Sequence, residues 1–198
     1  MTSTLCAEIA AMAAKLVVDE GMEYGPAKKR AAKLLGKHST RGVELPSNEE
    51  VEDEVRTYID LFCADTQPAE LQALREAAVM WMQRLAEFRP HLTGAVWRGT
   101  ATRLSAVHIQ LYCDDSKSAE LALIDKGADY DVGSAPGPRG ELVDVLTVAS
   151  PSQALGELVT VHLTVLDHDD LRGALKPDAR GRPLRGDLAA LRQLMQQP

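Results

Sequence analysis

Residues 94–111 read GAVWRGTATRLSAVHIQL, and this stretch decides which fold the chain can adopt. It begins at Gly94, and a second glycine follows at Gly99. Because glycine accepts positive φ angles, both positions suit tight turns. From residue 106 onward the side chains alternate between apolar and polar and include β-branched residues, which predicts a strand. The stretch therefore predicts a glycine turn that leads, through a short connection, into a strand.

Further strands are predicted on both sides of this stretch. The patterning predicts strands over residues 91–96, 106–113, 129–134, 142–149 and 158–167. A helix is predicted over residues 118–127, between the second and third strands, and a last helix over residues 187–195. The glycines and prolines of GSAPGPRGE, residues 133–141, predict a mobile hairpin tip.

The first half of the chain has apolar residues at helical spacing instead. Helices are predicted over about residues 5–20, 26–35, 48–62 and 68–88. Ser47 and Glu50 form a capping-box pattern at the start of the third helix. Helices followed by strands predict an α+β fold, with N-terminal helices packed on a mixed, largely antiparallel sheet. We expect a helical region over residues 1–88 and an α/β domain over residues 89–198, or one continuous domain.

The composition is that of an ordinary globular protein. The 198 residues are 45% hydrophobic and 26% charged, and no apolar run approaches the ~18 residues of a membrane-spanning helix. The net charge of −7 argues against tight non-specific binding to nucleic acid. The first residues lack the basic start of a secretory signal, and Cys6, Cys63 and Cys113 lie far apart without a CxxC pair. We therefore expect a cytoplasmic protein without a structural zinc site.

Charged runs are predicted to lie on solvated surfaces. One basic run consists of Lys28, Lys29, Arg30 and Lys33, which we interpret as a solvated or salt-bridged helix face. The alternative is contact with the phosphates of RNA or DNA, for which the 4% of aromatic residues offers little stacking. The acidic run DHDD, residues 167–170, is predicted to favour the start of a following helix rather than to hold a metal. A polar loop is predicted to carry Lys176, Arg180, Arg182 and Arg185.

The order of residue types in residues 94–105 resembles the signature of the polymerase β-type nucleotidyltransferase superfamily. In that superfamily a Gly-Ser turn is followed by Arg-Gly and, further along, by Ser-Asp-hydrophobic-Asp-hydrophobic. The resemblance spans about residues 80–170, and residues 96–105 separate the turn from the first expected carboxylate. The matching residues are Gly94 and Ala95 for the turn, Arg98 and Gly99 for the Arg-Gly pair, and Ser105 for the serine.

The resemblance implies a site for two Mg²⁺ ions, because nucleotidyl transfer needs one ion to activate the attacking oxygen and one to bind the triphosphate. Acids at positions i and i+2 of one strand point to the same face and can share the ions. In this chain those positions fall on Ala106 and His108. A third carboxylate position falls on His162, with Asp144 and Asp131 as competitors. Alanine cannot ligate a metal and imidazole is a poor ligand for Mg²⁺, so the catalytic carboxylates are degenerate.

The two histidines at these positions have two interpretations. His108 and His162 each alternate with apolar neighbours on a predicted strand. Taken alone, each is expected to be a hydrogen-bonded residue of a sheet face rather than a metal ligand, because two histidines without a third ligand make a poor Zn²⁺ site. If both face one cleft, they indicate a remodelled site, in which either imidazole could contact phosphate.

The leading functional hypothesis is a nucleotidyltransferase-like protein that binds a nucleotide or phosphate ligand without transferring it. Arg98 would supply the electrostatic contact, and the amides of the glycine turn would surround the phosphate. The expected binding residues are Gly94, Ala95, Arg98, Gly99 and Ser105.

Two other functions stay open. One is an active transferase whose Mg²⁺ ions are held by displaced acids, for which the candidates are Asp131, Asp144 and Asp114. The other is a protein–protein interaction or regulatory module derived from such an enzyme, with its helical half forming a homodimer face or binding a partner.

Overall fold

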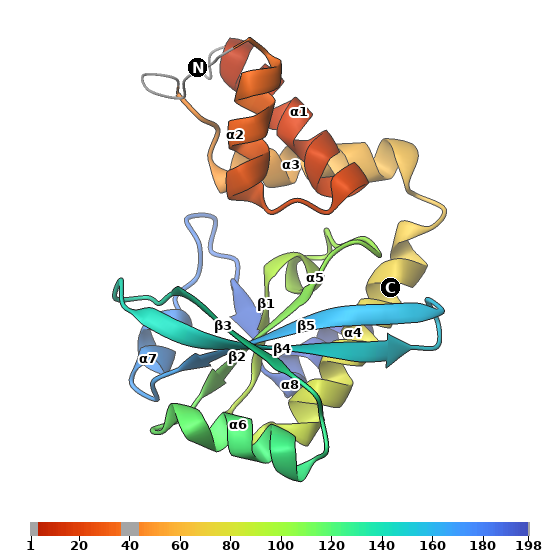
Figure 1. Ribbon diagram of the computed structural model, residues 1–198. Helices are drawn as coiled ribbons and strands as arrows, with labels where there is room; N and C mark the ends of the chain where they lie inside the picture. Colours follow the sequence, from red (N-terminus) through yellow and green to blue (C-terminus); the bar gives the residue numbers. More distant parts are fainter. Residues whose placement is uncertain (1–3, 37–43, 198) are drawn as a thin grey trace. The chain divides into compact units, whose positions relative to one another are not determined.

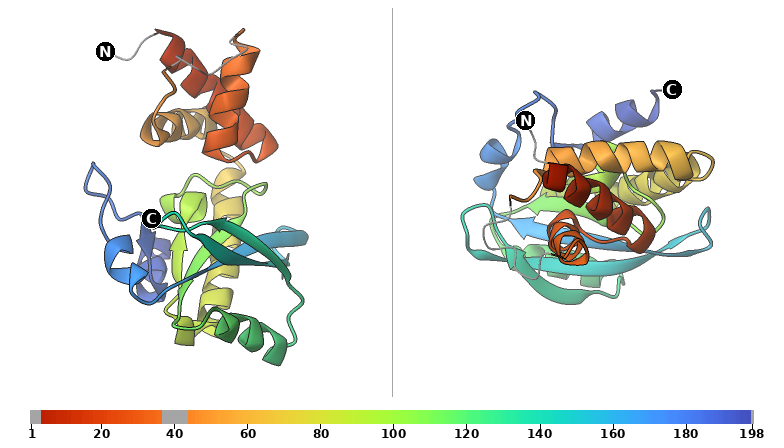
Figure 2. Two further views of the ribbon diagram at one scale, coloured as in Figure 1. Left: turned by 60° about the vertical axis from the view of Figure 1, so that its left-hand side comes forward. Right: turned by 90° about the horizontal axis from the view of Figure 1, so that it is seen from above.

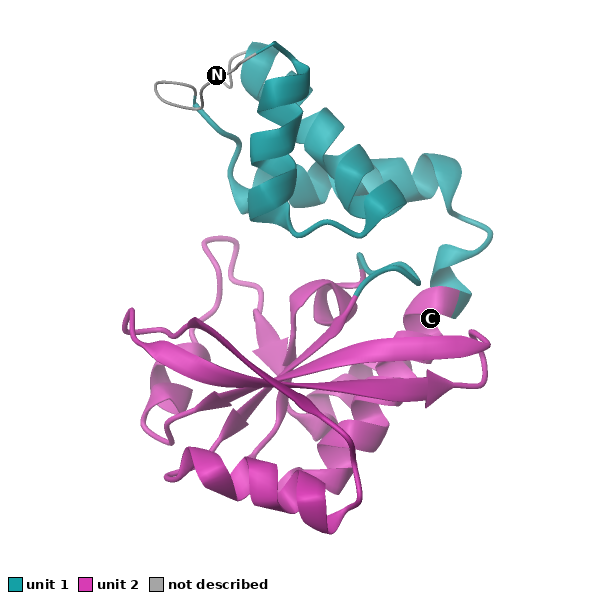
Figure 3. Cartoon of the chain, in the orientation of Figure 1, with its two compact units in different colours: residues 1–69, 100–105 teal, residues 70–99, 106–198 magenta. Residues whose placement is uncertain are grey.

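The computed structural model describes residues 4–36 and 44–197 (Figure 1). The chain divides into two compact units, which are coloured separately in Figure 3: residues 1–69 with 100–105, and residues 70–99 with 106–198. The first unit is helical and the second contains a sheet. Within the described ranges, no helix combines the length and the apolar character needed to cross a membrane.

The helical unit begins with three helices, which Figure 2 shows grouped together. They are α1 (Thr4–Glu20), α2 (Tyr24–Leu34) and α3 (Asn48–Phe62). Helix α1 packs against both of the others, and small or β-branched side chains such as Ala13, Ala27 and Val55 are fully buried between them. The predicted capping box is present, because the Ser47 hydroxyl accepts from the Glu50 amide while the Glu50 carboxylate accepts from the Ser47 amide.

The basic run on α2 has partners within the helical unit. The Lys28 ammonium donates to the carbonyl of Pro46 at 3.0 Å and to Oδ1 of Asn48 at 2.9 Å. The Arg30 guanidinium forms an ion pair with Glu20 on α1. Two of the four basic side chains in the run are therefore engaged in contacts that hold the unit's own helices and loops together.

The second unit contains a six-stranded mixed sheet. Its strands are β1 (His91–Thr93), β2 (Val107–Tyr112), β3 (Asp131–Pro136), β4 (Leu142–Ser152), β5 (Glu157–Leu166) and β6 (Arg185–Gly186). In space they follow the order β3-β4-β5-β2-β1-β6, with β2 and β5 parallel and all other neighbours antiparallel. This arrangement confirms the predicted α+β class and the largely antiparallel sheet.

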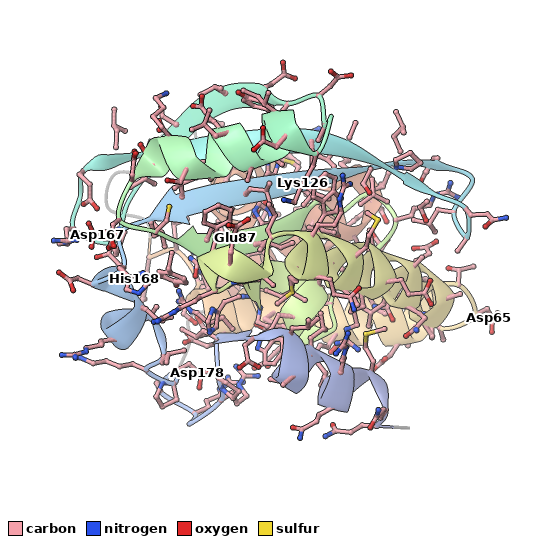
Figure 4. All side chains as sticks on the ribbon, turned by 90° about the horizontal axis from the view of Figure 1, so that it is seen from below. Asp65, Glu87, Lys126, Asp167, His168 and Asp178 are labelled. Carbon is pink, nitrogen blue, oxygen red and sulfur yellow. The ribbon has the colours of Figure 1, made fainter. Side chains whose placement is uncertain are left out.

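One face of the sheet lies against helices (Figures 1 and 4), and its central side chains are apolar and buried. These helices are α4 (Gln67–Arg84), which is followed by a 3₁₀ turn η1 (Ala86–Phe88), and α6 (Ser116–Asp125). Val107, Ile109 and Leu163 on this face have no exposed surface. Helix α8 (Leu188–Met195) packs beside β1 and β6. The core of this unit therefore lies between α4, α6 and the sheet.

The opposite face of the sheet carries polar side chains. Strand register pairs His108 with His162, and Gln110 with Thr164, on the parallel strands β2 and β5. On the next strand, Thr147 of β4 pairs with His162 and extends the row of the histidines. Because side chains alternate across a strand, these five residues point away from the buried face. All five are half-buried.

Two segments differ from the prediction. The sequence pattern predicts a strand through residues 94–96, but β1 ends at Thr93 and a short helix, α5 (Gly94–Arg98), follows. Gly94 has a φ of +75°, which turns the chain out of the extended conformation. The pattern also predicts the hairpin tip over residues 133–141, but β3 extends through Pro136 and shortens the tip.

Candidate functional site

The glycine turn lies directly beside the first histidine of the site. Thr93 pairs with His108 across β1 and β2, so Gly94 follows at the point where the chain leaves the sheet. A Cβ atom added to Gly94 would lie 3.5 Å from Cδ2 of His108. The Thr93 hydroxyl donates to the carbonyl of Leu184 at 3.0 Å, which holds the strand end next to the segment that leads into β6. The turn and the imidazole therefore lie side by side, at the end of β1 and near the start of β2.

Replacement of Gly94 by alanine is expected to lower the free energy of unfolding by about 1–2 kcal/mol, because an L-residue resists positive φ. The added methyl group would make an ordinary contact with His108, so crowding contributes little. Urea unfolding followed by circular dichroism measures the change. Gly25→Ala is the control, because its Cβ would meet open space and its φ is not positive. A loss below about 0.5 kcal/mol, the size of a neutral surface substitution, would contradict the expectation.

His108 and His162 lie side by side on the two parallel strands. Their ring centroids are 5.1 Å apart and the ring planes are inclined by 35°. On the far side of the pair, Oγ1 of Thr147 lies 2.9 Å from Nδ1 of His162 and shares a hydrogen bond with it. This contact fixes the ring of His162 and directs its Nε2 atom away from β4. The structure thus brings together two of the three positions at which the resemblance implies carboxylates.

The first of those positions, Ala106, lies immediately before β2 and is half-buried. Its methyl group offers no ligand atom for a metal. Among the residues that the structure describes, no group of three or more His, Cys, Asp or Glu side chains is arranged to hold a metal ion. Of the three positions at which the resemblance implies carboxylates, only those of the two histidines therefore carry a side chain that can bind a ligand.

The displaced acids are spread over the second unit. Asp131 pairs with Thr147 and so shares the face of the histidines, but β4 separates it from His162. Asp144 is three residues from Thr147 on the same strand, so it points to the opposite face. Asp114 follows the end of β2, next to the start of α6. These three carboxylates do not converge on the turn at Gly94.

The Arg-Gly pair ends helix α5. Gly99 has a φ of +85°, and its amide donates to the carbonyl of Ala95 at 2.9 Å, which closes the helix. The guanidinium of Arg75 on α4 donates from Nε to the carbonyl of Val96 at 3.1 Å and from Nη2 to that of Trp97 at 3.3 Å. Burial lowers the pKa of Arg75. Arg75 is not among the residues that the sequence pattern predicts for the site, although it is a cation within the apolar pattern of the fourth helix.

Two further residues are expected at the site, Arg98 at the end of a short helix and Ser105 in a turn. Arg98 is half-buried at the C-terminal end of α5. Ser105 belongs to the helical unit rather than to the sheet unit. Its hydroxyl accepts from the amide of Thr102 at 3.0 Å, and its amide donates to the Thr102 carbonyl at 2.8 Å. Ser105 therefore has a local role in a turn, and its contact with a ligand stays a prediction.

Comparison with known proteins places the chain in no family. No protein-family model matches it, and no curated protein matches it. Among solved structures, it is similar to the structure of Cid1 in complex with the UTP analog UMPNPP, with a TM-score of 0.37 and 12% sequence identity. The match covers 56% of this chain and 36% of the Cid1 chain, so the chain spans about a third of the length of that protein.

Proposed function

We propose that the protein binds a nucleotide or another phosphate-bearing ligand on the polar face of its sheet and does not transfer it by two-metal chemistry. The observation that carries the proposal is the adjacency of His108 and His162 beside the turn at Gly94. Imidazole nitrogens donate hydrogen bonds to phosphate oxygens, and a protonated ring adds a positive charge. Gly94 brings the backbone of the turn next to His108, since an added Cβ atom would lie 3.5 Å from the imidazole ring.

The residues at the carboxylate positions support binding without transfer. Ala106 provides no ligand, and imidazoles bind Zn²⁺ or Cu²⁺ more readily than Mg²⁺, which requires oxygen donors in octahedral geometry. Asp144 faces the other side of the sheet, and Asp131 lies beyond β4. A triphosphate on this face would therefore be held by hydrogen bonds and cationic side chains rather than through a metal pair.

Isothermal titration calorimetry with ATP, GTP, CTP and UTP, each with Mg²⁺ and with EDTA, tests the proposal. At least one nucleotide is expected to bind, and binding is expected to persist in EDTA. His108→Ala and His162→Ala should each weaken it about 10-fold or more, the effect of losing one hydrogen bond to a charged group. His168→Ala is the control, because His168 lies beyond the end of β5 near Asp167 (Figure 4).

Two outcomes would overturn the proposal. The first is the absence of binding for all four nucleotides at millimolar concentration. The second is release of pyrophosphate in the presence of Mg²⁺ or Mn²⁺ that is lost in Asp131→Asn, because that result would establish transfer through a displaced acid.

A further inference from the structure

A second site lies on the same face, one step further along the two central strands. Gln110 follows His108 by two residues on β2, and Thr164 follows His162 by two residues on β5. Both line a cavity of about 340 Å³, whose other walls come from the β3–β4 hairpin, from the short helix α7 (Asp170–Ala174) and from β6. This volume is at the lower end of the range for small-molecule pockets.

Arg185 contributes a positive charge to this cavity. Its Nη1 atom donates to Oε1 of Gln110, which also accepts from the Tyr112 hydroxyl at 3.0 Å. Its Nε atom is buried and has no hydrogen-bond partner among the described residues. The ion pairs of the described residues do not include Arg185. Because Nη1 already donates to Gln110, a planar anion would bind to the edge formed by Nε and Nη2, through two parallel hydrogen bonds.

Asp170 contributes a negative charge. Its side chain is only 7% exposed, and its Oδ1 atom pairs with Nη2 of Arg139, on the hairpin, at 2.9 Å. Its other oxygen, Oδ2, is buried and accepts no hydrogen bond from the described residues. A buried carboxylate oxygen without a donor is costly, so a ligand that brings an N–H group to this atom is favoured.

The two opposite charges line one cavity without pairing with each other. Both act on the buried Tyr112: burial raises the pKa of this phenol, Arg185 lowers it, and the charge of Asp170 raises it. Arg185 and Asp170 nevertheless form no ion pair within 4.0 Å, since Asp170 is paired with Arg139 instead. Each residue therefore lines the same cavity and keeps one buried polar atom without a hydrogen-bond partner among the described residues.

We propose that this cavity binds a free α-amino acid in its zwitterionic form. The ligand carboxylate would take the Nε–Nη2 edge of Arg185, and its ammonium group would donate to Oδ2 of Asp170. The apolar lining that Leu166, Ala174 and Pro138 provide would contact an aliphatic side chain. The inference rests on the cavity's own residues and is independent of nucleotide binding at the histidines.

A simple anion fits the same residues less well. Phosphate or acetate could occupy the Arg185 edge but would leave Oδ2 of Asp170 without a donor, and it would bring a second negative charge toward that carboxylate. An amine alone would satisfy Asp170 and leave the buried guanidinium edge unpaired. A zwitterion satisfies both groups at once and adds no net charge to the cavity.

The test is a thermal-shift screen of the full chain with each standard L-amino acid, followed by calorimetry of the best binder. At least one amino acid should bind. Two matched analogues of that ligand, one without the amine and one without the carboxylate, should each bind about 10-fold more weakly or worse, because each leaves one buried charged group unsatisfied. Inorganic phosphate serves as the simple anion for comparison.

Two conservative variants locate the site. Arg185→Lys keeps the positive charge but removes the Nε–Nη2 edge of the guanidinium group. Asp170→Asn keeps the shape of the side chain but removes its negative charge. Each variant should weaken amino-acid binding about 10-fold or more. Arg172→Gln is the matched control, because Arg172 is exposed on the same short helix and should leave binding unchanged. Circular dichroism of each variant establishes that it is folded.

The inference is overturned if no amino acid binds, if phosphate or the analogue without the amine binds as tightly as the amino acid, or if both folded variants bind normally. Amino-acid binding is expected whether or not a nucleotide binds, so the two proposals can fail separately.

Discussion

Replacement of Leu163 by alanine is expected to lower the free energy of unfolding by about 2–5 kcal/mol, the range for truncating a fully buried leucine. Leu163 lies on β5, in the interior of the sheet, and has no exposed surface. It pairs with Ile109 of β2 and Leu146 of β4, both of which are also fully buried, so the lost side chain would leave a cavity with apolar walls. Rigid neighbours on both sides limit how far the structure can collapse into that space.

Urea unfolding followed by circular dichroism measures this loss. Leu158→Ala is the matched control, because Leu158 lies on the same strand but is 65% exposed. The control is expected to change stability by no more than about 0.5 kcal/mol. Equal effects of the two substitutions would contradict the assignment of the buried face of β5.

Replacement of Gly186 by alanine is expected to destabilise the sheet unit by about 1–3 kcal/mol, the cost of overpacking a tight contact. A Cβ atom at Gly186 would overlap the Cη2 and Cζ3 atoms of the Trp97 indole ring and would lie 2.9 Å from its Cζ2 atom. The indole cannot move freely, because its Nε1 atom donates to the carbonyl of Pro183 at 2.8 Å. The substitution should therefore push β6, and Arg185 with it, away from the edge of the sheet.

Two measurements check this expectation. Urea unfolding should show the loss for Gly186→Ala but not for Gly173→Ala, because a Cβ at Gly173 would meet open space. The double variant Trp97→Phe with Gly186→Ala should be less destabilised than the sum of the two single variants, since the smaller ring removes the overlap. Strict additivity would show that the two residues do not interfere.

Much of the fold could be predicted because local patterns dominate it. The capping box at Ser47 and the helical spacing after it predict α3, and the alternation of residues 106–113 predicts β2. The class of the fold follows from helices in the first half and strands in the second. In each case the same residues determine both the local conformation and the buried face.

The site was less predictable because its parts meet only in the folded sheet. The adjacency of His108 and His162 depends on the register of the parallel pair β2 and β5, which no local pattern specifies. The face on which Asp144 lies depends in the same way on how β4 is registered against β5. The glycine turn was visible in the sequence, but the short helix that it starts was not.

The cavity lined by Arg185 and Asp170 could not be predicted from the sequence for a different reason. Strand β6 is two residues long and α7 is five, so neither carries enough periodicity to be identified. The sequence pattern therefore predicts a polar loop at Arg185, although the Arg185 side chain donates to Gln110 inside the sheet unit. The pattern predicts Asp170 at the start of a helix, and α7 does begin there, but the ion pair of Asp170 with Arg139 depends on the distant hairpin.

The parallel pairing of β2 with β5 also protects the protein against misfolding. If the register of either strand shifted by one residue, its histidine would point into the apolar core and a neighbouring aliphatic side chain would be exposed to water. Each misaligned state would therefore bear the desolvation cost of an imidazole in addition to the loss of apolar burial. The polar residues at the centre of this sheet thus make the correct alignment more stable than its nearest competitors, whatever molecule they bind.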